Sequence, residues 1–338
     1  MTNSSEWKKI RSPGIDSMET IDIGGIKQSL YLRGEDVKNP IILFIHGGPG
    51  YPEMPFLHDF QYPWEECFTI VQWDQRNAGK TFFLNDPEVV LETLSFERAL
   101  EDALEVTKYI RERLKQDKII VLGYSWGSAL GAALVQSYPE NFTAYIGLGQ
   151  VVNALENERV GFEALLAAAE AKGISEDIEA IKALSPHPPT GAFNESMMAQ
   201  IGAVRGWQTK YGIATSGREP KMKAILESSP YYTSEEKGYF SINFIKYQLP
   251  ILKFLLEGYD VRNFYGAPFE MPVFMIMGEN DYQTPHTMAR KFFDEISAPH
   301  KEFFLIPNAG HGAMQDNKEE FNRVLLEDIK NKLDLRGI

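Results

Sequence analysis

The stretch VLGYSWGSALGAALVQSYPE, residues 121–140, passes from an apolar run through a glycine-flanked turn into a helical pattern. Ser125 stands at the apex of this turn, with Gly123 and Gly127 two positions before and after it. Glycines at these positions relieve crowding where a strand turns sharply into a helix and holds a serine at the top of a sheet. A G-x-S-x-G match arises by chance about 0.1 times in a chain of this size. The rest of the chain must therefore decide between a nucleophile and a small residue in a tight connection.

The segments around this turn alternate between strand and helix patterns. Alternating polarity on either side of Gly24-Gly25 indicates a hairpin. Continuous apolar runs that end near glycine are typical of parallel strands buried on both faces, and they lie within residues 41–45, 68–81 and 118–125. Residues 95–115 carry apolar side chains at helical spacing, with Ser95 as the N-cap. This alternation predicts a mostly parallel α/β sheet flanked by helices.

The pattern changes in the middle of the chain, where helix follows helix with few strand signals. We interpret residues 152–265 as a helical cap inserted into an α/β core that consists of residues 1–151 and 266–338. The cap is rich in methionine and aromatic residues, which suit either ordinary packing or an apolar substrate site.

Two helix starts are predicted after the alternation resumes. Thr284-Pro285 has the form of an N-cap followed by proline at the first helical position. A final amphipathic helix is expected from Asp316 to Leu333, with Asp316 and Glu319 in capping-box spacing.

A serine nucleophile needs a base and an acid that orients the base. Among six histidines, His311 alone lies in a glycine-flanked loop, AGHG, directly after the last strand pattern. Asp281 follows the preceding strand pattern, and its neighbour Glu279 is the local rival, in a glycine-adjacent position more typical of a turn. The order Ser125, Asp281, His311 is that of α/β-hydrolases. We therefore predict an α/β-hydrolase fold in which these three residues form a catalytic triad.

The tetrahedral intermediate of such a reaction needs backbone N–H donors. One donor is expected from Trp126, directly after the nucleophile, and another from the loop HGGPG, where Gly48 is preferred over Gly47. In WDQRNAGKT we expect Asp74 and Arg76 to form an ion pair that braces the loop, with a direct catalytic role for Asp74 as the minority alternative.

Together these motifs resemble the proline iminopeptidase family of α/β-hydrolases. HGGPG, WDQR, GYSWGS, MGENDYQTP and AGHG follow one another in the family's order and spacing. The resemblance implies release of an N-terminal residue, often proline, through an acyl-serine intermediate and without a metal or other cofactor. It also implies a helical cap whose acidic residues bind the free amine of the substrate.

The cap departs from the family pattern where a Trp–Glu pair often occurs. After Trp207 the chain has Lys210 and Tyr211 at the corresponding place. The candidate substrate-binding residues are Glu53, Glu163, Glu195, Trp207 and Tyr211. An esterase or amidase for small neutral acyl substrates is the alternative function, and a non-catalytic binding protein on the same fold is a remote one.

Composition limits the kinds of partner. The net charge of −13 argues against nucleic acid, whose phosphates require basic clusters, and against anionic membrane surfaces. The N-terminus lacks the apolar block of a signal peptide, and the single cysteine allows no intramolecular disulfide, so we expect a cytoplasmic protein. The expected partner is a small molecule or a short peptide, and the sequence leaves the oligomeric state open.

Overall fold

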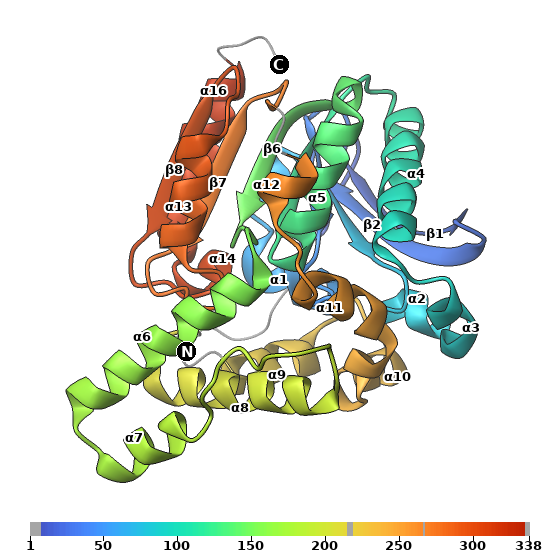
Figure 1. Cartoon of the computed structure of the whole chain (residues 1–338). Helices are drawn as coiled ribbons and strands as arrows, with labels where there is room; N and C mark the ends of the chain where they lie inside the picture. The colour runs from blue at the N-terminus through green and yellow to red at the C-terminus, as the bar shows by residue number, and fades with distance from the viewer. Residues whose placement is uncertain (1–7, 215–218, 266–267, 335–338) are drawn as a thin grey trace, which may run out of the picture.

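The computed structural model describes residues 8–214, 219–265 and 268–334, and it places a central sheet between layers of helices (Figure 1). The sheet has eight strands in the order β1-β2-β4-β3-β5-β6-β7-β8. The pairs β1–β2 and β2–β4 are antiparallel, and all other pairs are parallel. The strands are β1 (Ile15–Ile23), β2 (Ile26–Gly34), β3 (Ile41–Ile45), β4 (Thr69–Asp74), β5 (Ile119–Tyr124), β6 (Phe142–Leu148), β7 (Val273–Gly278) and β8 (Lys301–Ile306). The predicted hairpin and the mostly parallel sheet are confirmed.

Helices cover both faces of this sheet. Before β6 the helical segments are η1 (Met54–Phe56), α1 (Leu57–Phe60), η2 (Trp64–Glu66), α2 (Gly79–Phe83), α3 (Pro87–Glu92), α4 (Phe96–Leu114), α5 (Trp126–Ser137) and η3 (Pro139–Asn141). After β7 they are α13 (His286–Glu295), α14 (Ala313–Asp316), α15 (Lys318–Arg323), the π-helical η6 (Val324–Ile329) and α16 (Lys330–Asp334). The side chain of Ser95 caps α4 by accepting a hydrogen bond from the N–H of Arg98, as its position in the sequence predicts.

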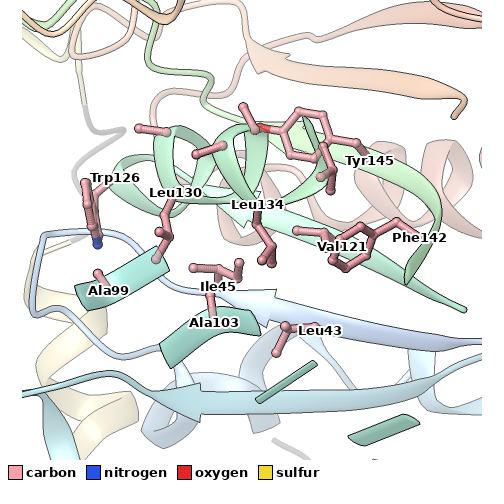
Figure 2. Packing of buried hydrophobic residues seen from close by; sticks show 14 of the residues in the cluster. Leu43, Ile45, Ala99, Ala103, Val121, Trp126, Leu130, Leu134, Phe142 and Tyr145 are labelled. Atoms are coloured by element: carbon pink, nitrogen blue, oxygen red, sulfur yellow. The ribbon is translucent and has the colours of Figure 1, made fainter. Parts of the chain in front are cut away.

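The central strands are apolar throughout because both of their faces are covered. In β3, Leu43 and Ile45 point into one core cluster, whereas the alternate residues Ile42 and Phe44 point into the other. On the first side they meet Leu130 and Leu134 of α5 together with small residues of α4 (Figure 2). This close packing fixes the start of α5 against the ends of β3 and β5.

Among the described residues, the chain between β6 and β7 is helical apart from loops and one isolated β-bridge between Asn153 and Asp260. The helices are α6 (Ala154–Lys172), α7 (Ser175–Lys182), α8 (Glu195–Tyr211), α9 (Glu219–Ser228), α10 (Ser234–Lys237), η4 (Gly238–Ser241), η5 (Phe244–Gln248), α11 (Leu249–Leu256) and α12 (Val261–Tyr265). We call α6 to α11 the helical insertion. Figure 1 shows it projecting beyond one edge of the sheet, whereas α12 lies beside α5 and Val261 belongs to the core. In the described part of the chain, no helix combines the length and apolarity that a membrane span requires.

Two predicted helix starts are wrong. Asn317, not Asp316, caps α15 by accepting from the N–H of Glu320, whereas the Asp316 carboxylate accepts from the N–H of Gly310 at 2.8 Å. Pro285 precedes the first residue of α13, and the side chain of Thr284 donates elsewhere instead of capping the helix. In both cases a hydrogen bond to a residue of the preceding loop replaces the capping bond that the spacing suggests.

Candidate active site

Ser125 lies at a sharp turn between β5 and α5. Its φ of 55° and ψ of −122° are unfavourable for a residue with a side chain, and backbone strain of this kind is often found at functional sites. The turn is tight because a methyl group on Gly127 would lie 2.0 Å from the carbonyl oxygen of Ile45, and one on Gly123 would lie 2.3 Å from that of Gly127. Both glycines are therefore required for steric reasons, as the motif predicts.

Three side chains from three strand ends meet at this turn. The Nε2 of His311 lies 2.9 Å from Ser125 Oγ, and its Nδ1 lies 2.8 Å from Asp281 Oδ2. Ser125 follows β5, Asp281 follows β7 and His311 follows β8, so the carboxyl ends of parallel strands carry all three. The structure thus brings together the three residues predicted as a triad.

The Asp281 carboxylate is fully buried and has several donors besides His311. Oδ1 accepts from the N–H groups of Gln283 and Thr284 at 3.0 and 2.9 Å, and Oδ2 accepts from Thr284 Oγ1 at 2.7 Å. These hydrogen bonds fix the orientation of the carboxylate. With Asp281 Oδ2 facing Nδ1, the ring of His311 points Nε2 toward Ser125 Oγ, from which it can accept a proton.

The loop after β3 closes the other side of the serine. A methyl group on Gly47 would lie 2.9 Å from Ser125 Cβ, and Gly48, with φ of +113°, lines the same cavity as Ser125. Trp126 is the first residue of α5, so its N–H has no acceptor within the helix and belongs to the positive end of the helix dipole. The structure therefore places Trp126 and Gly47 next to Ser125, and Gly48 lines the same cavity.

His46 braces this loop. It is buried, and burial lowers its pKa to about 4. Its Nε2 accepts from the N–H of Gln75 at 3.2 Å, so the proton of the neutral ring lies on Nδ1, which contacts the carbonyl oxygen of Gly47 at 2.9 Å. The Gln75 side chain accepts from the indole N–H of Trp126 at 3.0 Å. This chain of bonds links the two sides of the expected oxyanion pocket.

The predicted Asp74–Arg76 ion pair is not formed. Arg76 instead pairs with Asp102 of α4 at 2.9 Å, with both side chains buried. Asp74 accepts from the backbone N–H of Lys80 at 2.7 Å and from the hydroxyl of Tyr232. Burial raises the pKa of Asp74 to about 7. Asp74 therefore contacts the segment between α9 and α10 and not the serine.

A large cavity of about 1220 Å³ opens at Ser125 and His311 and extends between the core and the helical insertion. One wall is apolar and carries leucines 249, 252, 255 and 256 of α11. Of the five residues proposed to bind substrate, only Glu195 lines this cavity. Its carboxylate has no hydrogen-bond or ion-pair partner among the described residues.

The other four predicted substrate residues lie elsewhere. Glu53 is buried and accepts from the side chain of Gln315 at 3.2 Å, whereas Glu163 is exposed and pairs with Arg159. Tyr211 donates to Asp177 at 2.8 Å. Trp207 packs with the cluster between α6 and α8. Helix packing that the sequence does not display turned these side chains away from the cavity.

The cavity also has polar residues that the sequence analysis missed. Glu158 of α6 and Arg205 of α8 line it as an ion pair, and the second oxygen of Glu158 lies 3.0 Å from His187 Nε2. Asn157 lies beside Glu158 on the same wall. The only available signal was a polar pair in the first two turns of α6, which is indistinguishable from a solvent-facing helix surface. Among the described residues, no group of three or more His, Cys, Asp or Glu is placed to hold a metal ion.

The fold and this arrangement define an α/β-hydrolase. Residues 40–318 match the family described as alpha/beta hydrolase fold, and the chain belongs to that family. It is 28% identical over 321 residues to the probable aminopeptidase YbaC of Bacillus subtilis (strain 168), a match that covers 94% of this chain and 97% of the relative. A proline iminopeptidase of Arabidopsis thaliana is 37% identical over 105 residues, or 31% of this chain and 25% of that protein. The resemblance to proline iminopeptidases is thereby confirmed.

Solved structures agree on the fold. The proline iminopeptidase-related protein TTHA1809 from Thermus thermophilus superposes with a TM-score of 0.59 at 20% identity, covering 93% of this chain and 97% of that one. Est816, described as an N-acyl homoserine lactone degrading enzyme, gives the same TM-score at 16% identity and covers 91% of this chain and 99% of its own. One fold therefore carries differently named activities, so the cavity has to decide the substrate.

Proposed function

We propose that this chain is a serine hydrolase that cleaves short substrates through an acyl-enzyme intermediate. The observation that carries the proposal is the continuous hydrogen-bonded path from Ser125 Oγ to His311 and on to Asp281, at 2.9 and 2.8 Å, open to the cavity. Ser125 Oγ attacks the carbonyl carbon, and His311 Nε2 takes its proton. The same nitrogen then returns the proton to the leaving group.

The oxyanion is held by the N–H groups of Trp126 and Gly48, with Gly47 as the alternative donor. Donors of this kind act on charge that develops only in the transition state, and losing one costs about 100- to 1000-fold in rate. Water, activated by His311, then hydrolyses the ester on Ser125. The helical insertion acts as a cap that shields these steps and shapes the substrate site.

For the substrate, we propose peptides or amides with a free N-terminus, as the names of the relatives suggest. Glu195 is the carboxylate that supports this choice, because it lines the cavity and has no partner among the described residues. Glu158 is less suited to an ammonium group because Arg205 and His187 already occupy its oxygens. An esterase or amidase for neutral acyl substrates is the second candidate, favoured by the leucines of α11.

The test compares kcat/KM for prolyl, alanyl and leucyl arylamides with that for a short-chain 4-nitrophenyl ester, with Ser125→Ala as the control. Aminopeptidase activity requires arylamide cleavage that disappears in Ser125→Ala and when the substrate amine is acetylated. Ester cleavage without arylamide cleavage would select the second candidate. Turnover that survives Ser125→Ala would contradict the serine mechanism itself.

A further inference from the structure

Besides the α11 leucines, the cavity carries charged and polar side chains. Four charged side chains line the described part of the cavity, namely the acids Glu158 and Glu195 and the bases Arg205 and Lys246. Glu158 is paired with Arg205, and Lys246 is paired with Glu88 at 2.6 Å. Glu195 has no partner among the described residues, whereas Glu158, next to Asn157 in the chain, is paired. A site beside paired charges gains little from another charged group and suits a neutral hydrogen-bonding group.

Asn157 is a buried polar side chain of this cavity that lacks a partner among the described residues. Only 3% of its surface is exposed, and it lines the cavity next to Glu158. Its Oδ1 is enclosed and accepts no hydrogen bond, and its side chain makes no bond to any residue in the described ranges. Buried amides almost always have a partner in native structures. An unpartnered one at the edge of a substrate cavity therefore indicates a group whose partner arrives with the ligand.

The charged residues that line the cavity with Asn157 favour a neutral ligand group there. The guanidinium of Arg205 and the carboxylate of Glu158 are paired with each other, and Arg205 also donates to Gln208 Oε1 at 2.8 Å, so neither is a free counter-charge for a carboxylate or an ammonium. A carboxamide offers one donor group and one acceptor, and another amide matches both. The terminal torsion of an asparagine turns at low cost, so either atom can face the cavity.

The start of α6 is anchored next to the catalytic turn, because the N–H of Val151 donates to Ser128 Oγ at 2.8 Å. Val151, Ala154 and Asn157 all line the cavity that opens at Ser125. A group bound by Asn157 therefore lies in the same cavity as the carbonyl that Ser125 attacks.

We propose that Asn157 is a specificity-determining residue whose carboxamide binds a neutral amide group of the substrate, while the leucines of α11 contact an adjacent apolar group. The inference rests on the proposed hydrolase function and concerns the preference among its substrates: acyl groups that contain an internal amide should be cleaved faster than matched acyl groups that lack one. It does not depend on which residue binds a terminal amine.

Two esters of equal chain length separate this role from simple packing. One is 4-nitrophenyl hexanoate, and the other is the 4-nitrophenyl ester of N-acetyl-β-alanine, in which an amide replaces two methylene groups. In Asn157→Leu, which keeps the number and branching of the side-chain heavy atoms, we expect kcat/KM for the amide ester to fall about five- to tenfold, as for one lost neutral hydrogen bond. The value for hexanoate should change less than twofold. In the matched control Leu252→Ala, on the apolar wall, both esters should lose activity together.

A parallel loss on both esters in Asn157→Leu, or no loss on either, would overturn the assignment. Binding of N-pentylacetamide, followed by ligand-observed NMR, is measured in Ser125→Ala with and without Asn157→Leu. Weaker binding in the double variant supports the site even if Ser125 proves not to be a nucleophile, and equal binding rejects it. Failure of the proposed function is recognised separately, because neither ester would then be hydrolysed in a Ser125-dependent way.

Discussion

Replacing Gly127 by alanine should separate the two halves of the oxyanion pocket. The new methyl group would lie 2.0 Å from the carbonyl oxygen of Ile45 and 2.7 Å from that of His46, whereas real Cβ contacts essentially never fall below 3.0 Å. Both obstacles are backbone atoms at the end of β3, so no side chain can rotate away. The start of α5 must therefore move by about 1 Å relative to the HGGPG loop, which is the kind of rearrangement that overpacking forces.

The magnitude follows from that displacement. Overpacking of this kind costs about 1–3 kcal/mol in the free energy of unfolding. A misplacement of about 1 Å at a catalytic group costs about 100-fold in rate. Because the Trp126 N–H moves with α5, we expect kcat/KM to fall about 100-fold while the protein remains folded.

Gly131→Ala is the matched control within the same helix. Its methyl group would lie 3.1 Å from Val121 Cγ1 and 3.2 Å from Tyr145 Cε2, which are side-chain atoms that can yield by a few tenths of an ångström. The gain in helix propensity, about 1 kcal/mol from glycine to alanine, is shared by both variants and cancels in their comparison.

Hydrolysis of 4-nitrophenyl acetate and urea-induced unfolding are measured for both variants. If kcat/KM of Gly127→Ala stays within twofold of that of Gly131→Ala, the steric argument for the elbow is wrong.

Three further predictions concern buried charged residues of the core. Asp281→Asn should lower kcat about 10³- to 10⁴-fold, because an amide cannot hold the tautomer of His311; a fall below tenfold in ester hydrolysis would contradict the orienting role. Asp74 has its pKa raised to about 7 by burial, so its contribution to stability is present at low pH and lost as the pH rises through 7. The free energy of unfolding of Asp74→Asn, relative to that of the wild type, should therefore rise by about 4 kcal/mol between pH 4 and pH 8, at 1.36 kcal/mol per pKa unit. A difference between the two proteins that does not change with pH in urea titrations would argue against this explanation. Arg76→Met should lower the free energy of unfolding by about 3 kcal/mol. This is near the lower end of the cost of breaking a buried ion pair, because Arg98 still contacts Asp102. An unchanged unfolding midpoint would refute this prediction.

Local patterns predicted most of the core because they are repeated along single strands and helices. The apolar run at β3 has the same bounds in the sequence analysis and in the structure, since a strand buried on both faces needs no polar position. The starts of α13 and α15 were misjudged because Thr284 and Asp316 bind groups outside their own helices. A capping motif cannot reveal such competition.

The sequence by itself determined which residues stand at the ends of the parallel strands. Since the carboxyl ends of neighbouring parallel strands lie at one edge of a sheet, Ser125, Asp281 and His311 had to come close once the strand order was given. Only the tertiary structure decided the partner of each charge and the walls of the cavity. Arg76 forms an ion pair with Asp102. Of the five residues proposed to bind substrate, Glu195 alone lines the cavity at Ser125. These outcomes depend on how helices distant in sequence pack against one another, and no local spacing records that packing.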